Sequence, residues 1–223
     1  MLKPKKNDTM NYIYQIIIVL IFLGFSKTVK AQYKEDHLEP VASIFDISNI
    51  KFEYYSKVRK VLFNGLSDTP EIRFLVIPSF SPENVLDIEF DRDNNKYYIV
   101  YHICEKKIWY NKKWYKVKVK KYKKEIDKES VKLIKSLFEK AIARTKLTEN
   151  ETLVFTDGTQ YYFSVNKFGL KSGTVWSPSD GTKMRKLVDI GTELIKLAKS
   201  ENEVVKINKE LRRKIENLME ELK

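Results

Sequence analysis

The sequence predicts an α+β domain in which helices pack on one side of a mainly antiparallel meander sheet and a long helix ends the chain. Two observations lead to this fold class. Residues 71–122 contain short apolar, β-branched and aromatic segments separated by turn residues, which is typical of consecutive antiparallel strands. Residues 127–142 and 184–198 repeat apolar side chains every three or four positions, so each segment is expected to form a helix with one apolar face.

The first elements of the predicted domain are a helix and a set of strands. The helix is expected within residues 48–64, because its apolar side chains recur at helical spacing and Gly65 can end it. Residues 85–90 alternate apolar and acidic side chains, so one face of that strand should be buried and the other solvated. The strands of the meander are expected at residues 71–78, 85–90, 96–104 and 114–122.

A second helix and a further pair of strands follow the meander. Asp127 can cap the helix of residues 127–142, since a carboxylate at that position accepts hydrogen bonds from N–H groups of the first turn. The Asp-Gly pair at residues 157–158 tolerates positive φ angles. It therefore predicts a tight turn between strands at residues 152–156 and 160–165.

Two more helices complete the predicted domain. Either Asp180 or Thr182 can cap the helix of residues 184–198, because both side chains accept hydrogen bonds from backbone N–H groups. Residues 202–222 place apolar side chains along one stripe among charges of both signs, which predicts a long C-terminal helix. That helix can pack back on the domain or pair with another chain.

The first 31 residues have the order of a cleavable secretory signal. Three lysines lie within the first six residues and precede an apolar run at residues 12–25. That run is shorter than the ~20 residues of a spanning helix, and small or modest side chains precede Gln32. We therefore expect cleavage after Ala31 and a secreted or periplasmic protein with no stable membrane span. The junction resembles those of exported proteins of Gram-negative bacteria, and an uncleaved signal anchor is the alternative.

The expected mature chain is basic and contains one domain. Residues 32–47 are expected to be a flexible leader, and residues 48–223 a single α+β domain. The first 31 residues contain five lysines and one aspartate, so 37 basic and 29 acidic side chains remain, a net charge of about +8. Such a balance favours anionic partners. Cys104 is the single cysteine, so no disulfide can form within the chain.

Residues 106–124 are the most unusual segment of the sequence. They contain ten lysines and no arginine, interleaved with tryptophan and tyrosine. Residues 108–110 and 114–122 flank an Asn-Lys-Lys turn, so we expect them to form a hairpin. Alternate side chains of a strand point to opposite faces, and one face of this hairpin would therefore present a row of lysines.

That row supplies the candidate ligand-binding residues. Lys116, Lys118 and Lys120 would attract phosphates or carboxylates. Trp109 and Trp114 could stack on sugars or bases. The alternative is that the lysines only protect an edge strand from aggregation while the aromatic side chains fill the core.

No catalytic or metal-binding motif is present in the sequence. His102 and Cys104 share a strand face and could form a thiolate-imidazole pair, but a free cysteine behaves chiefly as a buried apolar side chain. The chain has two histidines, which excludes a multi-histidine metal centre, and no cofactor is expected. A cluster of His102, Asp157 and Asp180 in one deep pocket would favour a hydrolase.

These observations predict an exported, non-enzymatic binding or accessory protein of the bacterial cell envelope. Its expected partner is an anionic envelope component or another protein, and nucleic acid is less favoured in that compartment. One alternative is a small periplasmic hydrolase. The other is a protein-interaction module that acts through the C-terminal helix of residues 202–222.

Overall fold

The computed structural model describes residues 36–41, 45, 51–147 and 157–223. Residues 33–223 form one compact unit, which contains the whole of the predicted domain. The strands are β1 (Glu39–Val41), β2 (Ile72–Pro78), β3 (Asn84–Asp91), β4 (Lys96–Cys104), β5 (Val119–Ile126), β6 (Thr159–Asn166), β7 (Leu170–Trp176) and β8 (Val204–Val205). The helices are α2 (Phe52–Leu62), α3 (Lys128–Ala143), α4 (Lys183–Ala198) and α5 (Lys209–Glu221).

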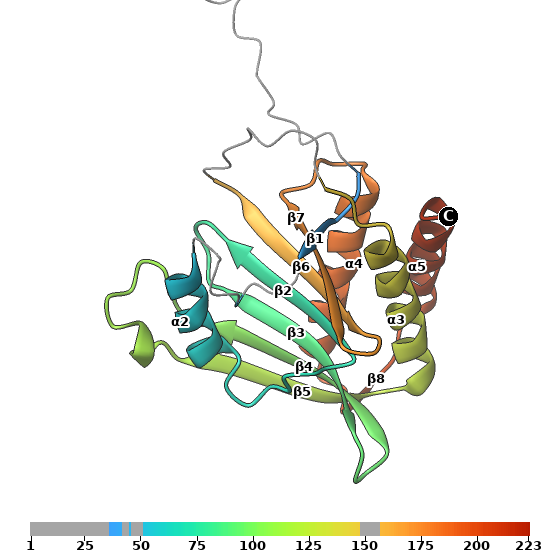
Figure 1. The fold of residues 1–223 in the computed structure, drawn as a ribbon. Helices are drawn as coiled ribbons and strands as arrows, with labels where there is room; N and C mark the ends of the chain where they lie inside the picture. Colours follow the sequence, from blue (N-terminus) through green and yellow to red (C-terminus); the bar gives the residue numbers. More distant parts are fainter. Residues whose placement is uncertain (1–35, 42–44, 46–50, 148–156) are drawn as a thin grey trace, which may run out of the picture. The chain divides into compact units, whose positions relative to one another are not determined.

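The strands of the described part form a single sheet in the order β1-β7-β6-β2-β3-β4-β5-β8 (Figure 1). Every neighbouring pair is antiparallel except β5 and β8, which are parallel. Strands β2 to β5 lie side by side in chain order, as expected of a meander. The predicted α+β class with a mainly antiparallel sheet is therefore confirmed.

Helices cover both faces of the sheet (Figure 1). On the face of α3, α4 and α5, Phe74 of β2 stacks on Phe163 with ring centroids 4.9 Å apart. Phe163 in turn meets Phe138 of α3 at 5.3 Å. On the opposite face, Leu75 belongs to the buried cluster that includes Val58 of α2. Consecutive residues of β2 thus enter two separate cores.

The predicted packing of helices on one side of the sheet describes α3, α4 and α5, and α2 departs from it. Strand β2 is the reason, because apart from Arg73 its residues are apolar on both faces. A strand of that composition needs cover on both sides. The helix predicted within residues 48–64 supplies the second cover.

The C-terminal helix is shorter than the predicted segment of residues 202–222. Val204 and Val205 form β8 and pair with the end of β5, as their β-branched side chains favour. Asn208 then caps α5 by accepting a hydrogen bond of 2.8 Å from the Leu211 N–H. The apolar stripe of this 13-residue helix is buried, with Leu218 at 1% exposure. Packing back on the domain is therefore the use that α5 makes of its stripe.

The remaining predicted elements have mixed outcomes. Asp127 and Thr182 are the N-caps of α3 and α4, as expected. Strand β6 pairs with β7 across the turn at residues 167–169, and β7 was not predicted. The expected strand at residues 152–156 lies outside the described residues. Within the predicted leader, Leu38 is fully buried and β1 pairs with β7, so these residues belong to the fold.

None of the helices within the described ranges is long and apolar enough to cross a membrane.

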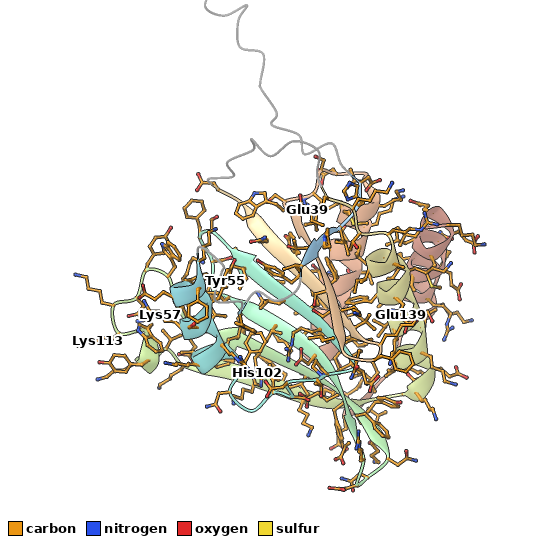
Figure 2. All side chains as sticks on the ribbon, in the orientation of Figure 1. Glu39, Tyr55, Lys57, His102, Lys113 and Glu139 are labelled. Atoms are coloured by element: carbon orange, nitrogen blue, oxygen red, sulfur yellow. The ribbon has the colours of Figure 1, made fainter. Side chains whose placement is uncertain are left out.

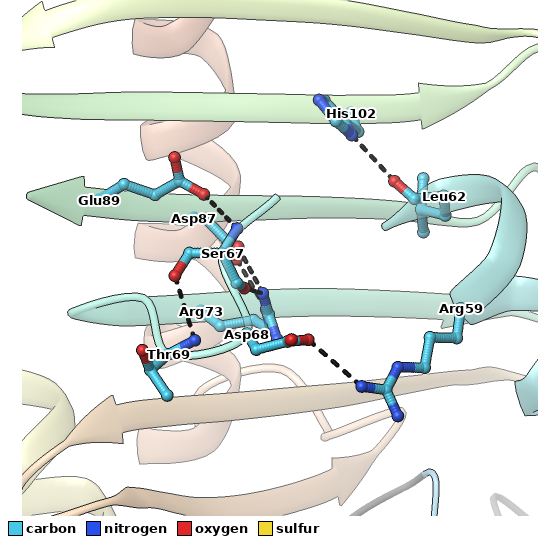
Figure 3. A network of polar contacts seen from close by, with 9 residues as sticks. All are labelled: Arg59, Leu62, Ser67, Asp68, Thr69, Arg73, Asp87, Glu89 and His102. Carbon is cyan, nitrogen blue, oxygen red and sulfur yellow. Dashed lines mark hydrogen bonds and ion pairs between the residues drawn. The ribbon is translucent and has the colours of Figure 1, made fainter. Parts of the chain in front are cut away.

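A buried ion pair joins β2 to β3 beneath the loop that follows α2 (Figure 3). Arg73 donates two hydrogen bonds to Asp87, at 2.8 and 2.6 Å. It also donates to the Ser67 carbonyl oxygen at 2.7 Å, and its guanidinium lies 4.6 Å from the centroid of the Phe63 ring. Burial raises the pKa of Asp87 to about 6, although Arg73 opposes that rise.

The solvated face predicted for residues 85–90 is therefore wrong at Asp87, which is fully buried. The alternation correctly places Asp87 on the face opposite Leu86. That face is covered, however, by α2 and by the loop after it. Arg73, from the neighbouring strand, makes the burial of the carboxylate tolerable.

Replacing Asp87 by alanine should lower the free energy of unfolding by about 3–5 kcal/mol, because Arg73 would stay buried without its partner. The double variant Arg73→Met, Asp87→Leu removes both charges and should be less destabilised than the single variant. Urea unfolding at neutral pH measures both losses. A double variant at least as unstable as Asp87→Ala would contradict this reading of the ion pair.

Candidate functional site

A cleft opens at one end of the sheet, beside the first turn of α2. Strands β2 and β7 end there, β6 begins there, and the chain after β4 supplies a further wall. Its volume of about 310 Å³ is typical of a small ligand site. We call it the aromatic cleft, and it is lined by Lys51, Tyr54, Tyr55, Ile77, Pro78, Ser79, Lys107, Trp109, Tyr110, Asp157, Gln160 and Trp176.

Five aromatic side chains line the aromatic cleft and differ in exposure. Tyr54 and Tyr55 belong to α2 and are buried, and Figure 2 shows Tyr55. Trp109 and Tyr110 are 53% and 65% exposed, and Trp176 is half-buried. Trp109 meets Tyr54 edge-on, with ring centroids 4.8 Å apart. The cleft thus has a buried aromatic floor and aromatic walls that reach solvent.

The Glu83 carboxylate connects α2 with the chain after β4 and, through Lys107, with the end of β2. It is fully buried, and it accepts a hydrogen bond of 2.6 Å from the Tyr54 hydroxyl and one of 3.0 Å from the Ile108 N–H. The Lys107 ammonium lies 3.3 Å from the same carboxylate and also donates to the Pro78 carbonyl oxygen. Bonds to a charged acceptor are stronger than neutral ones, and these compensate the cost of burying the charge.

A chain of neutral polar groups extends this network along the floor. The Tyr55 and Tyr162 hydroxyls are 3.1 Å apart, and the Tyr55 hydroxyl donates to the side-chain amide oxygen (Oε1) of Gln160 at 3.4 Å. Burial raises the pKa of Tyr54, Tyr55 and Tyr162, so all three hydroxyls stay protonated at neutral pH. Of these groups, Tyr55 and Gln160 line the cleft and can form hydrogen bonds with a ligand, whereas the protonated hydroxyls offer no base.

The wall formed by Trp176 depends on Gly158. This glycine has a φ of +142°, and a Cβ atom there would lie 2.7 Å from the indole nitrogen of Trp176. Its N–H donates to the Ser79 hydroxyl at 3.0 Å, while the Ser79 N–H donates to its carbonyl oxygen at 2.7 Å. The paired bonds join the turn after β2 to the start of β6, so two walls hold a fixed separation.

The described lining of the aromatic cleft has a net positive charge. Lys51 and Lys107 are its cations, and Asp157 is its one carboxylate. The Lys51 ammonium lies 5.7 Å from the centroid of the Trp176 ring, and that of Lys107 lies 5.7 Å from the centroid of Tyr54. Each cation is therefore placed beside an aromatic face.

The predicted lysine hairpin is wrong. Residues Trp114–Lys116 form a 3₁₀ helix, and β5 begins only at Val119. Of the three lysines, Lys120 lies on a strand, whereas Lys116 and Lys118 precede it. All three are exposed, but they do not form one row and none of them lines the aromatic cleft. That they bind a ligand stays a prediction.

The two tryptophans of this segment are placed differently. Trp109 lines the aromatic cleft. Trp114 is half-buried against the cluster under α2, with its ring centroid 6.0 Å from the Lys60 ammonium. Ile108 and Val117 are buried in the same cluster, so the chain between them loops outward instead of continuing two strands. This burial explains why the alternating pattern did not give a hairpin.

His102 and Cys104 lie on one face of β4, as predicted, and both are buried. The Nδ1 atom of His102 is 2.9 Å from the Leu62 carbonyl oxygen, and burial lowers the pKa of the imidazole (Figure 3). Burial raises the pKa of the Cys104 thiol to about 12, so no thiolate forms at neutral pH. The pair therefore has a structural role.

The aspartates considered for a hydrolase lie apart from His102. Asp157 lines the aromatic cleft, and Asp180 is exposed at 3.5 Å from Arg185. The described residues also contain no group of three or more histidine, cysteine, aspartate or glutamate side chains that could hold a metal ion.

Comparison of the chain with protein families, with curated proteins and with solved structures finds no match. A functional proposal for this chain therefore rests on the geometry of the aromatic cleft.

The sequence singles out two residues of the aromatic cleft, Trp109 as a ligand-binding residue and Asp157 only for a hydrolase alternative, and it does not indicate the others. Both Lys51 and Tyr54 belong to the predicted helix, where helical spacing assigns Tyr54 to the apolar face and indicates no ligand role for either residue. Trp176 ends a strand that was not predicted, and Glu83 lies in an assumed turn. No local pattern links these segments, because strand pairing and the Glu83 carboxylate bring them together. A glutamate just before an alternating strand is the only signal, and it is a weak one.

Replacing Glu83 by alanine should lower the free energy of unfolding by about 3–5 kcal/mol, because Tyr54, Lys107 and the Ile108 N–H would lose a buried charged acceptor. Glu83→Gln keeps one carbonyl acceptor and should lose less. Glu105→Ala removes an exposed carboxylate nearby and serves as the matched control. Chemical denaturation measures all three, and an alanine variant as stable as that control would refute the role of Glu83.

Proposed function

We propose that this protein is an exported, non-enzymatic binding protein of the bacterial cell envelope that holds an anionic, ring-bearing ligand, such as an acidic sugar, in the aromatic cleft. The observation that carries the proposal is the lining of the cleft. Aromatic faces and two lysines converge there from α2, the β4–β5 loop and the end of β7.

The aromatic side chains favour a ligand with flat apolar faces. Trp109 and Trp176 present large rings with few rotatable bonds, so little conformational entropy is lost when a ligand stacks on them. The hydroxyl group of Tyr55 and the amide group of Gln160 belong to the same lining and can bind ligand hydroxyls. A sugar ring combines these two requirements, because its faces are apolar and its edge carries hydroxyls.

The charge favours an acidic ligand. Lys51 and Lys107 are the cations of the described lining, and Glu83 compensates the charge of Lys107. The mature chain as a whole is expected to carry about +8. Attraction to a carboxylate or phosphate within the cleft is stronger than at an open surface, because the walls exclude part of the solvent.

The small number of carboxylates in the described lining favours binding over hydrolysis. Glycoside hydrolysis ordinarily uses two carboxyl groups that flank the bond to be broken. The described lining has one, Asp157, and the nearby Glu83 is fully engaged in holding the walls. The neutral hydroxyls of Tyr54 and Tyr55 offer no base in its place.

Titration of residues 32–223 with an oligomer of galacturonic acid, followed by tryptophan fluorescence, tests the proposal. Two of the three tryptophans line the cleft, so binding should change the emission. We expect tighter binding than for a neutral galactose oligomer of equal length, because only the acidic oligomer is attracted to the Lys51 ammonium. Trp109→Ala should weaken binding about tenfold.

Each variant has a control outside the cleft. Tyr115→Ala removes another exposed aromatic ring of the same loop, and Lys116→Glu reverses a charge as Lys51→Glu does. Both controls should bind as the unchanged protein does. The proposal fails if the acidic and neutral oligomers bind equally, or if Trp109→Ala and Lys51→Glu behave like their controls.

A further inference from the structure

The loop between β4 and β5, residues 105–118, forms a second surface with its own chemistry. We call it the basic aromatic loop. It extends beyond α2 at one edge of the sheet, and Lys113 lies on its outer part (Figures 1 and 2). Three of its residues, Lys107, Trp109 and Tyr110, line the aromatic cleft. The other residues of the loop line no part of that cleft.

The base of the basic aromatic loop is fixed. The Glu105 N–H donates to the Lys118 carbonyl oxygen at 2.8 Å and closes the loop. Ile108 and Val117 are buried in the cluster under α2, and the Ile108 N–H binds the Glu83 carboxylate. The residues between them are therefore presented outward from two anchored points, which reduces the entropy lost when the loop binds a partner.

The outer part of the loop combines aromatic rings with lysines. Its exposed large apolar residues are Trp109, Tyr110 and Tyr115, at 53%, 65% and 62% exposure, and all are aromatic. Its aliphatic residues, Ile108 and Val117, point inward. The exposed lysines are Lys106, Lys112, Lys113, Lys116 and Lys118. Across the described residues none of these lysines forms an ion pair.

This combination of lysines and aromatic rings is complementary to the surface of an anionic bilayer. Tryptophan and tyrosine are enriched where a protein meets the headgroup region, because their rings are apolar and their edges are polar. Lysines close to anionic headgroups each strengthen attachment about fivefold. Protein–protein interfaces, by contrast, are depleted of lysine and enriched in arginine, which this loop lacks.

We propose that the basic aromatic loop docks on an anionic phospholipid bilayer, with Tyr115 and Tyr110 in the headgroup region and Lys112, Lys113 and Lys116 against lipid phosphates. Attachment through these side chains is peripheral and reversible. The docking surface does not depend on the proposed ligand of the aromatic cleft, and it uses residues outside that cleft apart from Tyr110.

Vesicle flotation tests this docking. Residues 32–223 are used because they contain the compact unit and lack the apolar run of the signal, which would itself bind lipid. We expect flotation with vesicles that contain phosphatidylglycerol but not with vesicles of phosphatidylcholine alone. Binding should be lost at about 1 M salt, where the Debye length is about 3 Å.

Two variants locate the contact. Lys112→Glu, Lys113→Glu, Lys116→Glu should bind at least ~100-fold more weakly. Tyr115→Ser should weaken binding while the net charge stays the same. The matched control is Lys128→Glu, Lys132→Glu, Lys209→Glu, which makes the same change in net charge at exposed positions of α3 and α5 on the other side of the sheet. Circular dichroism confirms that each variant is folded.

The proposal is overturned if the loop triple variant floats as well as the unchanged protein, or if the control triple variant loses binding equally, since net charge alone would then explain attachment. It is also overturned if the protein does not float with phosphatidylglycerol vesicles and binds single-stranded nucleic acid through the same lysines. Sugar binding in the aromatic cleft should persist in the loop triple variant, so failure of one proposal leaves the other open to its own test.

Discussion

The buried Glu83 carboxylate is the contact on which the two candidate surfaces depend. It binds Tyr54 of α2, the Ile108 N–H after β4, and Lys107. Regular strand pairing alone does not hold any of these segments in place. Because an ionised carboxylate cannot be buried without donors, the segments and the charge stabilise one another. Tyr54 and Lys107 line the aromatic cleft, and Lys107 and Ile108 also belong to the basic aromatic loop.

A second constraint comes from the sheet, which is buried on both faces. Strand β2 contributes Phe74 to one core and Leu75 to the other. The second core is small and is closed by α2 and by the β4–β5 loop. The Arg73–Asp87 pair lies within this layer. Burial there removes both charges from water, and each charge compensates the other. The two candidate surfaces are therefore built from the same segments that cover the second face.

The fold could be predicted from the sequence where a signal is local. Apolar spacing and the caps Asp127 and Thr182 define α3 and α4, and the meander follows from the turn residues between β2, β3 and β4. Prediction failed where a distant contact outweighs the local pattern. The lysine hairpin was such a case, because burial of Ile108 and Val117 turns the chain outward. Val204 likewise joins β5 instead of extending α5.

The candidate site could not be predicted in the same way. Its residues come from α2, from the ends of three strands and from one loop, and their positions are set by pairing partners far along the chain. Composition did identify the unusual segment of residues 106–124, since exposed aromatic side chains among lysines are distinctive in any fold. It did not show which of them face the aromatic cleft.

Hydrogen exchange at the Ile108 amide tests the central role of Glu83 most directly, measured by NMR on residues 32–223. This amide lies outside any helix or strand, and its acceptor is the Glu83 carboxylate. We expect it to exchange as slowly as the Cys104 amide of β4 and to lose that protection in Glu83→Ala. An Ile108 amide that exchanges as fast as that of the exposed Lys112 would contradict the role assigned to Glu83.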